Sequence, residues 1–367
     1  MRDPRVENLA RILVEHSTRV SKGDVCAIEG PAAAEPLVRA VYERVLKAGG
    51  HPIVSMEPDG AIATFFEYAS DEQIDWISPT SRFIAEEADV RIRLMASENT
   101  REMSGIEPAK QTQRQKAMAP LMATMMERAA SGEHRWALTI FPTNAYASGA
   151  AMSLGDYEDF YFGACLANAD DPVAAWKTAS EETHRLAEWI EGHEEVRITG
   201  PGTDLTLGIA GRHFIAADGT HNLPDGEFFT GPIEDSAEGE ITYQLPATYA
   251  GREVAGVRFR FERGRVVDAS AERGEQFLLE MLGTDDGARR LGELGIGTNF
   301  GITRGTGEIL LDEKIGGTVH LAVGRSYPDT GGRNESAIHW DMICDLREGG
   351  RITVDGTVLQ EDGRFVV

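Results

Sequence analysis

The chain is short of the residues that mark several protein classes. Its three cysteines, Cys26, Cys165 and Cys344, lie far apart and form no Cys-x-x-Cys pair. Neither a disulfide framework nor a cysteine-based zinc site is therefore indicated. No apolar run approaches the length needed to span a bilayer, and the N-terminus lacks the apolar core of a signal peptide. These absences predict a cytoplasmic protein with reduced thiols and no membrane partner.

Positive charge is scarce as well. Lysine and arginine together number 36 against 60 aspartates and glutamates, which gives a formal net charge of -24. Because a phosphate backbone would be repelled and no basic patch stands out, we expect no nucleic-acid partner. The hydrophobic content of 41% is that of an ordinary soluble globular protein.

The length and the patterning predict two domains, since a single core seldom grows to 367 residues. In residues 1–192, the strand DVCAIEG, the amphipathic helix PAAAEPLVRAVYERVLKAGG and the strand HPIVSM indicate a crossover unit. In residues 193–367, short strands alternate with turns, and Arg263-Gly264 and Asp355-Gly356 are hairpin signals. We predict an α/β N-terminal domain with a mainly parallel sheet, then an α+β C-terminal domain with mainly antiparallel strands, divided near Gly192.

Two histidines and an aspartate stand out near the end of the chain. In SAIHWDMICDL, strand alternation places His339 and Asp341 on one face and Trp340 on the other. In GTVHLAVG, Val319, Leu321 and Val323 form the apolar face, which leaves His320 on the opposite one. A turn at Gly331-Gly332 could pair the two strands antiparallel. The pattern predicts either a metal site or a cluster of catalytic bases.

Two glutamates extend this set. Glu227 lies in HNLPDGEFFTGP, on a turn entering a strand, and Glu293 lies in RRLGELGIG, where a helix covering EQFLLEMLGTDDGARRLGEL runs into glycines. With the histidines and the aspartate they could hold one or two transition ions. Asp312 and Glu313 in ILLDEK could support the metal ligands from behind, but a solvated turn is the preferred interpretation. GIGTNFG lacks the spacing of a dinucleotide fingerprint, and no GxSxG or HExxH motif is present.

These segments resemble the M29 metallo-aminopeptidases, the aminopeptidase T and aminopeptidase S group. The likeness is carried by NLPDGEFFTGP, LGELGIGTN, ILLDEKIGGTVHLAVG and SAIHWDMICDL, and more weakly by DVCAIEGPAAAEPLVRAVYERVLKAGG and IFPTNAYASGAAMSLGDYEDF. It thus spans most of the chain. The resemblance implies two divalent ions (Zn, Co, Mn or Mg) held by Glu227, Glu293, His320, His339 and Asp341. It also implies that Tyr327, seven residues after His320, is an active-site tyrosine.

From the resemblance we expect a homodimeric hydrolase that removes N-terminal residues from short peptides. Glu293 would take a proton from the attacking water, and Tyr327 would donate to the developing oxyanion. The segment 328–338 is shorter than in the best-known peptidases of this family, which leaves a second interpretation open. In it, His320, His339 and Asp341 hold a single Fe(II) in a ring-cleaving dioxygenase of the dihydroxypyridine type. A third is a protein that binds metal or peptide without catalysis.

Overall fold

The computed structural model describes residues 3–249 and 251–367. Backbone contacts divide the chain into two compact units. The first extends to Lys177 and includes Gly219–Pro224, and the second comprises Thr178–Asp218 and Asp225–Val367. The boundary that the sequence suggests near Gly192 lies just beyond helix α9 (Pro172–Ile190), and it stays a prediction.

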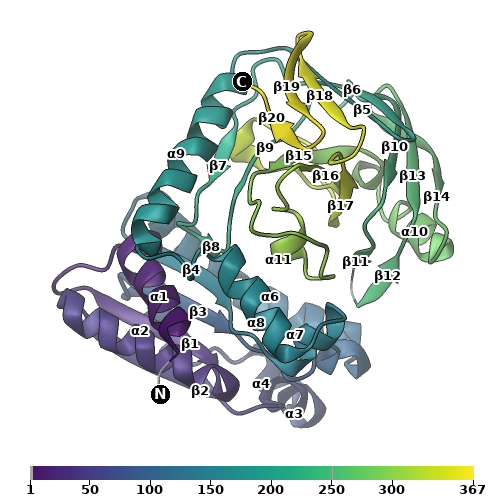
Figure 1. The fold of residues 1–367 in the computed structure, drawn as a ribbon. Helices are drawn as coiled ribbons and strands as arrows, with labels where there is room; N and C mark the ends of the chain where they lie inside the picture. The colour runs from purple at the N-terminus through teal and green to yellow at the C-terminus, as the bar shows by residue number, and fades with distance from the viewer. Residues whose placement is uncertain (1–2, 250) are drawn as a thin grey trace. The chain divides into compact units, whose positions relative to one another are not determined.

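The first unit is built on a parallel sheet (Figure 1). Its spatial order is β2 (His51–Glu57), β1 (Val25–Pro31), β3 (Val90–Met95), β4 (Arg135–Ile140) and β8 (Asn222–Leu223), and every neighbouring pair is parallel. The predicted crossover from β1 through α2 (Glu35–Ala48) to β2 is confirmed. Helix α2 buries Leu37, Val41 and Val45 along one stripe and ends at Gly49, whose φ of 86° glycine adopts without strain.

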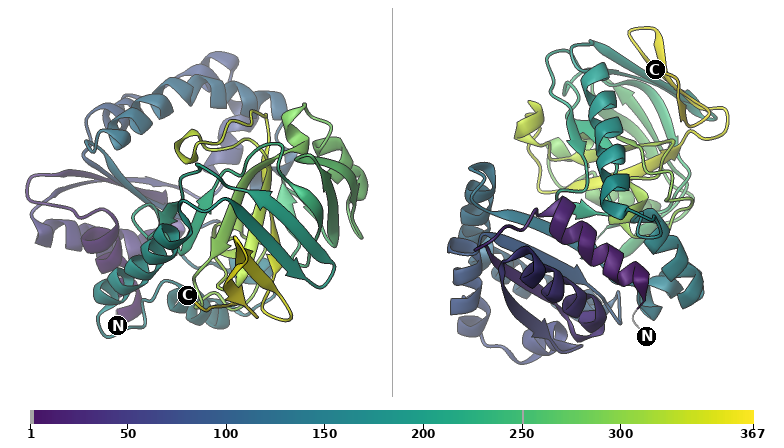
Figure 2. Two further views of the ribbon diagram at one scale, coloured as in Figure 1. Left: turned by 90° about the horizontal axis from the view of Figure 1, so that it is seen from above. Right: turned by 60° about the vertical axis from the view of Figure 1, so that its left-hand side comes forward.

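The remaining helices of this unit cover the sheet. Figures 1 and 2 show α1 and α2 on one face and α6 on the other. None of the helices among residues 3–249 and 251–367 is long and apolar enough to cross a membrane. The bounds are α1 (Pro4–Ile12), α3 (Ala61–Tyr68), α4 (Asp71–Asp75), α5 (Pro79–Glu86), α6 (Pro108–Ala130), α7 (Asn144–Gly149) and α8 (Leu154–Ala164).

The second unit contains two larger antiparallel sheets, as the sequence predicts. One has the order β14 (Arg265–Ser270), β13 (Val257–Glu262), β10 (Glu238–Tyr243), β6 (Thr203–Gly208), β5 (Glu195–Gly200), β18 (Arg351–Val354), β19 (Thr357–Glu361) and β20 (Arg364–Phe365). The other, called the site sheet below, has the order β17 (His339–Asp345), β16 (Thr318–Gly324), β15 (Leu291–Gly297), β9 (Glu227–Thr230) and β7 (Ile215–Ala217). A short ribbon pairs β11 (Ala247–Tyr249) with β12 (Arg252–Val254).

The two sheets share one hydrophobic core. Strand β13 alternates buried and exposed side chains along its whole length, so Phe259 and Phe261 point inward. Trp340 and Leu321 of the site sheet belong to the same core. Both predicted hairpin turns are confirmed: Arg263-Gly264 joins β13 to β14, and Asp355-Gly356 joins β18 to β19, with positive φ at all four residues.

One predicted helix is wrong in length. Helix α10 covers only Glu275–Met281, and residues 291–297 form strand β15 instead of the end of a helix. Gly283 and Gly287 interrupt the helical pattern, and the following LGELGIG is buried on both sides in the middle of the site sheet. Tertiary burial outweighs the local helical signal there. The short α11 (Ile309–Asp312) completes the helices of this unit.

Candidate metal centre

Four adjacent strands bring the five predicted ligands to one face of the site sheet. Glu227 begins β9, Glu293 lies in β15, His320 in β16, and His339 and Asp341 in β17. Ala322 of β16 is the direct partner of both Glu293 and Asp341, so these two carboxylates flank a small side chain. As predicted, Trp340 points to the opposite face, into the core. Antiparallel pairing of β16 with β17 creates this arrangement.

The geometry of the cluster is tight. The Nε2 atom of His320 lies 3.3 Å from Oε2 of Glu227 and 3.7 Å from Oε1 of Glu293. The Nε2 atom of His339 lies 3.1 Å from Oε2 of Glu293 and 3.5 Å from Oδ2 of Asp341. Glu293 therefore stands between the two imidazoles and connects the whole set.

Glycines make room for this packing. Gly295 is the direct partner of His320, and a Cβ atom at Gly295 would come within 2.0 Å of the His320 ring. At the start of β15, the register shifts between Leu291 and Glu293, which is the signature of a β-bulge. A Cβ at Gly292 would come within 2.2 Å of the Arg325 carbonyl oxygen, so only glycine fits in the bulge. Such bulges re-aim side chains next to active sites.

The exposed fraction of the side chains increases from one side of the cluster to the other. His320 is 1% exposed, whereas the side chain of His339 is 25% exposed and Tyr327 is 44% exposed. Tyr327 lies at this open side, with its hydroxyl 3.5 Å from Nε2 of His339. The Nδ1 atom of His339 lies 2.7 Å from the carbonyl oxygen of Arg325 and donates to it. In the neutral imidazole, that bond leaves the lone pair on Nε2, which faces the carboxylates, the usual arrangement of a metal-binding histidine.

Burial and mutual contacts shift the pKa values of the carboxylates and histidines in the cluster. Burial raises the pKa of Glu227 to about 8 and that of Asp341 to about 7. Burial would also raise the pKa of Glu293, but contacts with His320 and His339 outweigh it and lower the value to about 2. Burial opposes the charged histidines, yet the surrounding carboxylates raise the pKa of His320 to about 10 and of His339 to about 9. Without a metal, the cluster holds protons in place of cations.

The residues present fit a divalent ion. Within the described residues, Oε2 of Glu227 and Oδ1 of Asp341 are buried and have no hydrogen-bond partner. Buried polar atoms are normally satisfied, so such atoms need a ligand. Two groups have donor atoms within 4.8 Å of one another: Glu293, His339 and Asp341, and Glu313, His320 and Asp341. Nitrogen and carboxylate donors of this kind suit zinc, cobalt, manganese or iron.

The second of these groups contains Glu313, which the sequence interpretation did not count among the ligands. The solvated turn expected at Asp312 and Glu313 is wrong, because Asp312 is only 2% exposed and accepts hydrogen bonds from Thr306 and Gly307. The neighbouring Glu313 reaches the cluster, where one of its carboxylate oxygens lies within 4.8 Å of donor atoms of His320 and Asp341. The next residue, Lys314, is fully buried. Three charged residues between the buried Leu311 and Ile315 were the available sequence signal.

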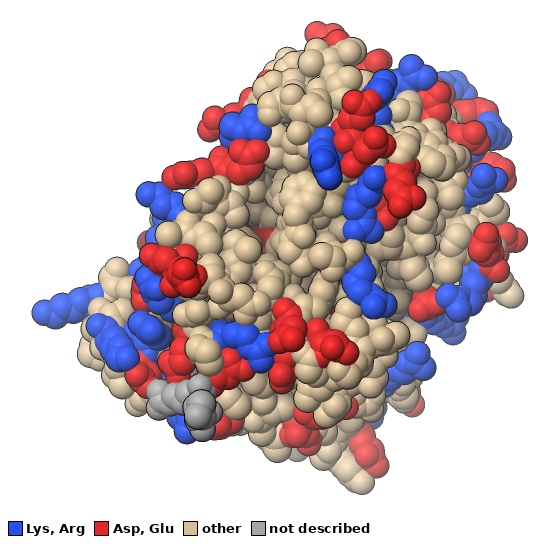
Figure 3. Space-filling model, viewed as in Figure 1, with Lys and Arg blue, Asp and Glu red and all other residues tan. Residues whose placement is uncertain are grey.

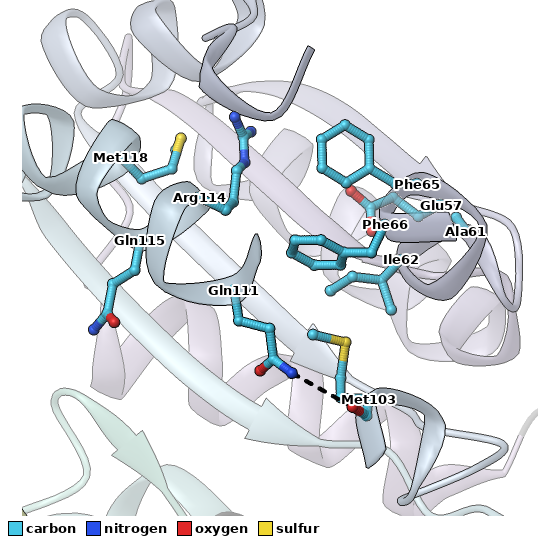
Figure 4. Close-up of a pocket in the computed structure, with 10 residues that line it drawn as sticks. All are labelled: Glu57, Ala61, Ile62, Phe65, Phe66, Met103, Gln111, Arg114, Gln115 and Met118. Carbon is cyan, nitrogen blue, oxygen red and sulfur yellow. Dashed lines mark hydrogen bonds between the residues drawn. The ribbon is translucent and has the colours of Figure 1, made fainter. Parts of the chain in front are cut away.

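A separate groove lies within the first unit and has a different character. Its volume is about 710 Å³, and it is lined mostly by apolar and amide side chains of α3 and α6 (Figure 4). Phe65 and Phe66 of α3 face Met118 and Arg114 of α6 across it, and the guanidinium of Arg114 lies 5.5 Å from the Phe65 ring centroid. Among the described residues that line this groove there is no histidine or cysteine, so these residues lack the imidazole and thiolate donors of a metal centre.

Comparison with known proteins decides the family. Residues 2–365 match the family described as thermophilic metalloprotease (M29). The chain belongs to this family. Among curated relatives, aminopeptidase T of Thermus thermophilus is 27% identical, covering 99% of this chain and 98% of the relative. Aminopeptidase 2 of Geobacillus stearothermophilus is 25% identical, covering 96% and 95%. The family that the sequence resembles is thereby confirmed, and with it the use of divalent metal.

A solved structure with a similar fold supports the family assignment. The structure of wild-type AmpT from Thermus thermophilus matches with a TM-score of 0.83 at 26% identity, covering 99% of each chain. A 2,5-dihydroxypyridine dioxygenase from Pseudomonas putida KT2440 matches with a TM-score of 0.57 at 13% identity, covering 99% of this chain and 97% of that one. The second likeness shows a shared fold alone. The predicted fold class is confirmed.

Proposed function

We propose that this protein is a metal-dependent aminopeptidase that removes N-terminal residues from short peptides. The observation that carries the proposal is the convergence of Glu227, Glu293, His320, His339 and Asp341 on one face of the site sheet. Membership of a metalloprotease family supports it. The dioxygenase interpretation needs only three of these residues and leaves unexplained why Glu293 contacts both histidines.

The same five residues would hold two divalent ions, with Glu313 as a further donor. The chemistry that such ions would supply is polarisation of the scissile carbonyl and a lowered pKa for a bound water. The identity of the metal, the homodimer and the cytoplasmic location stay predictions.

On the face seen in Figure 3, acidic and basic side chains lie intermixed, so the net charge of -24 is not gathered into one patch there.

The roles of the protein side chains follow from their environments. Glu293 contacts both histidines and, as a carboxylate beside the ions, can take a proton from the attacking water. Burial, reinforced by Glu293 and Asp341, raises the pKa of Tyr327, so its phenol stays protonated and can donate to the developing oxyanion. The Arg325 carbonyl keeps His339 in one tautomer and orientation.

The test is release of free amino acid from a panel of dipeptides by protein purified without chelator, with metal content measured on the same sample. We expect metal-dependent release that ceases when the substrate's terminal amine is acetylated. Glu293→Gln should lower turnover by about a hundredfold or more, the typical contribution of a positioned base. Glu348→Gln, an exposed glutamate of the same unit, is the matched control.

Two results would oppose the proposal. Near wild-type turnover in Glu293→Gln would remove this residue as the base. One iron per chain, no peptide cleavage and oxygen uptake with dihydroxylated aromatic rings would instead support the dioxygenase interpretation.

A further inference from the structure

Lys314 is a buried cation that lies beside carboxylates of the candidate metal centre. It follows α11, and its side chain is 0% exposed. Its ammonium contacts the carboxylate of Glu313 and lies 3.4 Å from Oε1 of Glu227 and 4.0 Å from Oδ1 of Asp225. These partners are themselves largely buried, so the contacts are little screened by solvent.

The position of Lys314 distinguishes the two groups of metal donors. The groups share Asp341 but otherwise use different residues. Glu313 belongs to the group that also contains His320, and the ammonium of Lys314 contacts it directly. In the described part of the chain, Glu293, which only the other group contains, has no contact with Lys314 within 4.0 Å, and neither has the shared Asp341. A positive charge therefore stands beside one group and not beside the other.

The two groups also differ in how their histidine is held, and this difference too favours metal binding at the group that contains His339. In the group of Glu293, His339 and Asp341, the His339 ring is held by the Arg325 carbonyl, with Nε2 facing both carboxylates. His320, in the other group, has no such partner on Nδ1 within the described residues. An imidazole fixed by an outer hydrogen bond binds metal more tightly than one without it.

We propose that Lys314 makes the two metal positions unequal, weakening divalent-ion binding at Glu313, His320 and Asp341 relative to Glu293, His339 and Asp341. The inference rests on the proposed function only in requiring that the site binds divalent ions. Lys314 already neutralises the Glu313 carboxylate, and its ammonium repels a second cation at short range in a poorly screened interior. Lys314 is thus a positioning residue, and the group that includes His339, on the accessible side, fills first.

The experiment is a Co²⁺ titration of chelator-treated, redialysed full-length protein, followed by calorimetry and by the visible absorbance of the bound ion. Wild-type protein should show one tight equivalent and then a second that binds at least about tenfold more weakly. Lys314→Met should strengthen the second step by about tenfold or more and leave the first within about threefold. Lys47→Met, which breaks an exposed lysine–glutamate pair with Glu43, should change neither step.

A second readout separates charge from packing. Without Lys314, the buried carboxylates lose their counter-charge, so the metal-free variant should melt at a lower temperature than metal-free wild type. Saturating Co²⁺ should restore most of that loss, because the ion supplies the missing positive charge. A purely structural lysine would lower the melting temperature equally with and without the ion. Should Lys314→Met fail to fold, Lys314→Gln, which keeps polar donors without the charge, replaces it.

Several outcomes overturn the inference. In wild type alone, two indistinguishable steps, or a single equivalent at saturation, would do so whatever the variants show. Equal weakening of both steps in Lys314→Met would reduce the residue to a structural role. No peptide enters the titration, so unequal steps in a protein that cleaves no peptide would refute the proposed function and leave this inference standing.

Discussion

Replacing Gly295 by alanine should disable the metal centre without touching any of its ligands. A Cβ at this position would lie 2.0 Å from Cε1 and 2.1 Å from Nε2 of His320, which is fully buried across the strand pair. To reach ordinary contact at 3.4 Å, the ring must move by about 1.4 Å. Metal–ligand distances are expected to lie within about 0.2 Å of their typical values, so a displacement of this size would take His320 out of the site.

The cost to the fold should be smaller than the cost to binding. Overpacking of a filled interior typically costs about 1–3 kcal/mol. For a domain of this size, that corresponds to a fall in melting temperature of roughly 2–12 °C. We therefore expect a folded variant with at least one divalent ion fewer per chain than wild type.

The assay is metal content per chain after dialysis against micromolar Co²⁺, with circular dichroism and thermal melting on the same samples. Gly155→Ala is the matched control: Gly155 lies in helix α8, and an added Cβ there meets nothing within 4 Å. Wild-type metal content and melting temperature in Gly295→Ala would refute the packing argument, because the ring would then have space that the structure does not provide.

Three further predictions concern the histidines and the tyrosine of the site. His339→Ala should lower metal content, since His339 contacts both Glu293 and Asp341; unchanged stoichiometry would move the centre elsewhere. Tyr327→Phe should lower turnover by about a hundredfold with unchanged metal content, and a loss below about tenfold would make the phenol marginal. The chelated protein should lose stability as pH rises from about 6.5 to 10. In this window the folded state keeps the protons of His320 and His339, with pKa values of about 10 and 9, which the unfolded chain releases near 6.5. A melting temperature that rises across the window in chelator would contradict this sign.

Strand alternation is enough to place most of the site on one face of a sheet. The period of two puts His339 and Asp341 together and Trp340 opposite, and it separates His320 from Val319 and Leu321. This rule is local and depends on backbone geometry alone. The hairpin at Asp355-Gly356 is predictable for the same reason, since its positive φ angles favour particular residue types.

Sequence patterns fail where burial overrides local propensity. The segment around Glu293 carries helical periodicity upstream, yet it folds as the central strand of the site sheet. Glu313 resembles a solvated residue because charge beside a turn usually is solvated. Its approach to His320 and Asp341 joins segments that meet only after folding.

Periodicity along the sequence by itself determined the two kinds of sheet, because it depends on backbone geometry alone, and motifs that resemble a known family determined the family and the five candidate ligands that the resemblance implies. Only the tertiary structure decided that Glu293 stands between both histidines, that Gly295 makes room for His320, and that the ammonium of Lys314 lies against Glu227 and Glu313. These relations join strands far apart in the sequence. They arise from strand register and close packing, which no local pattern encodes.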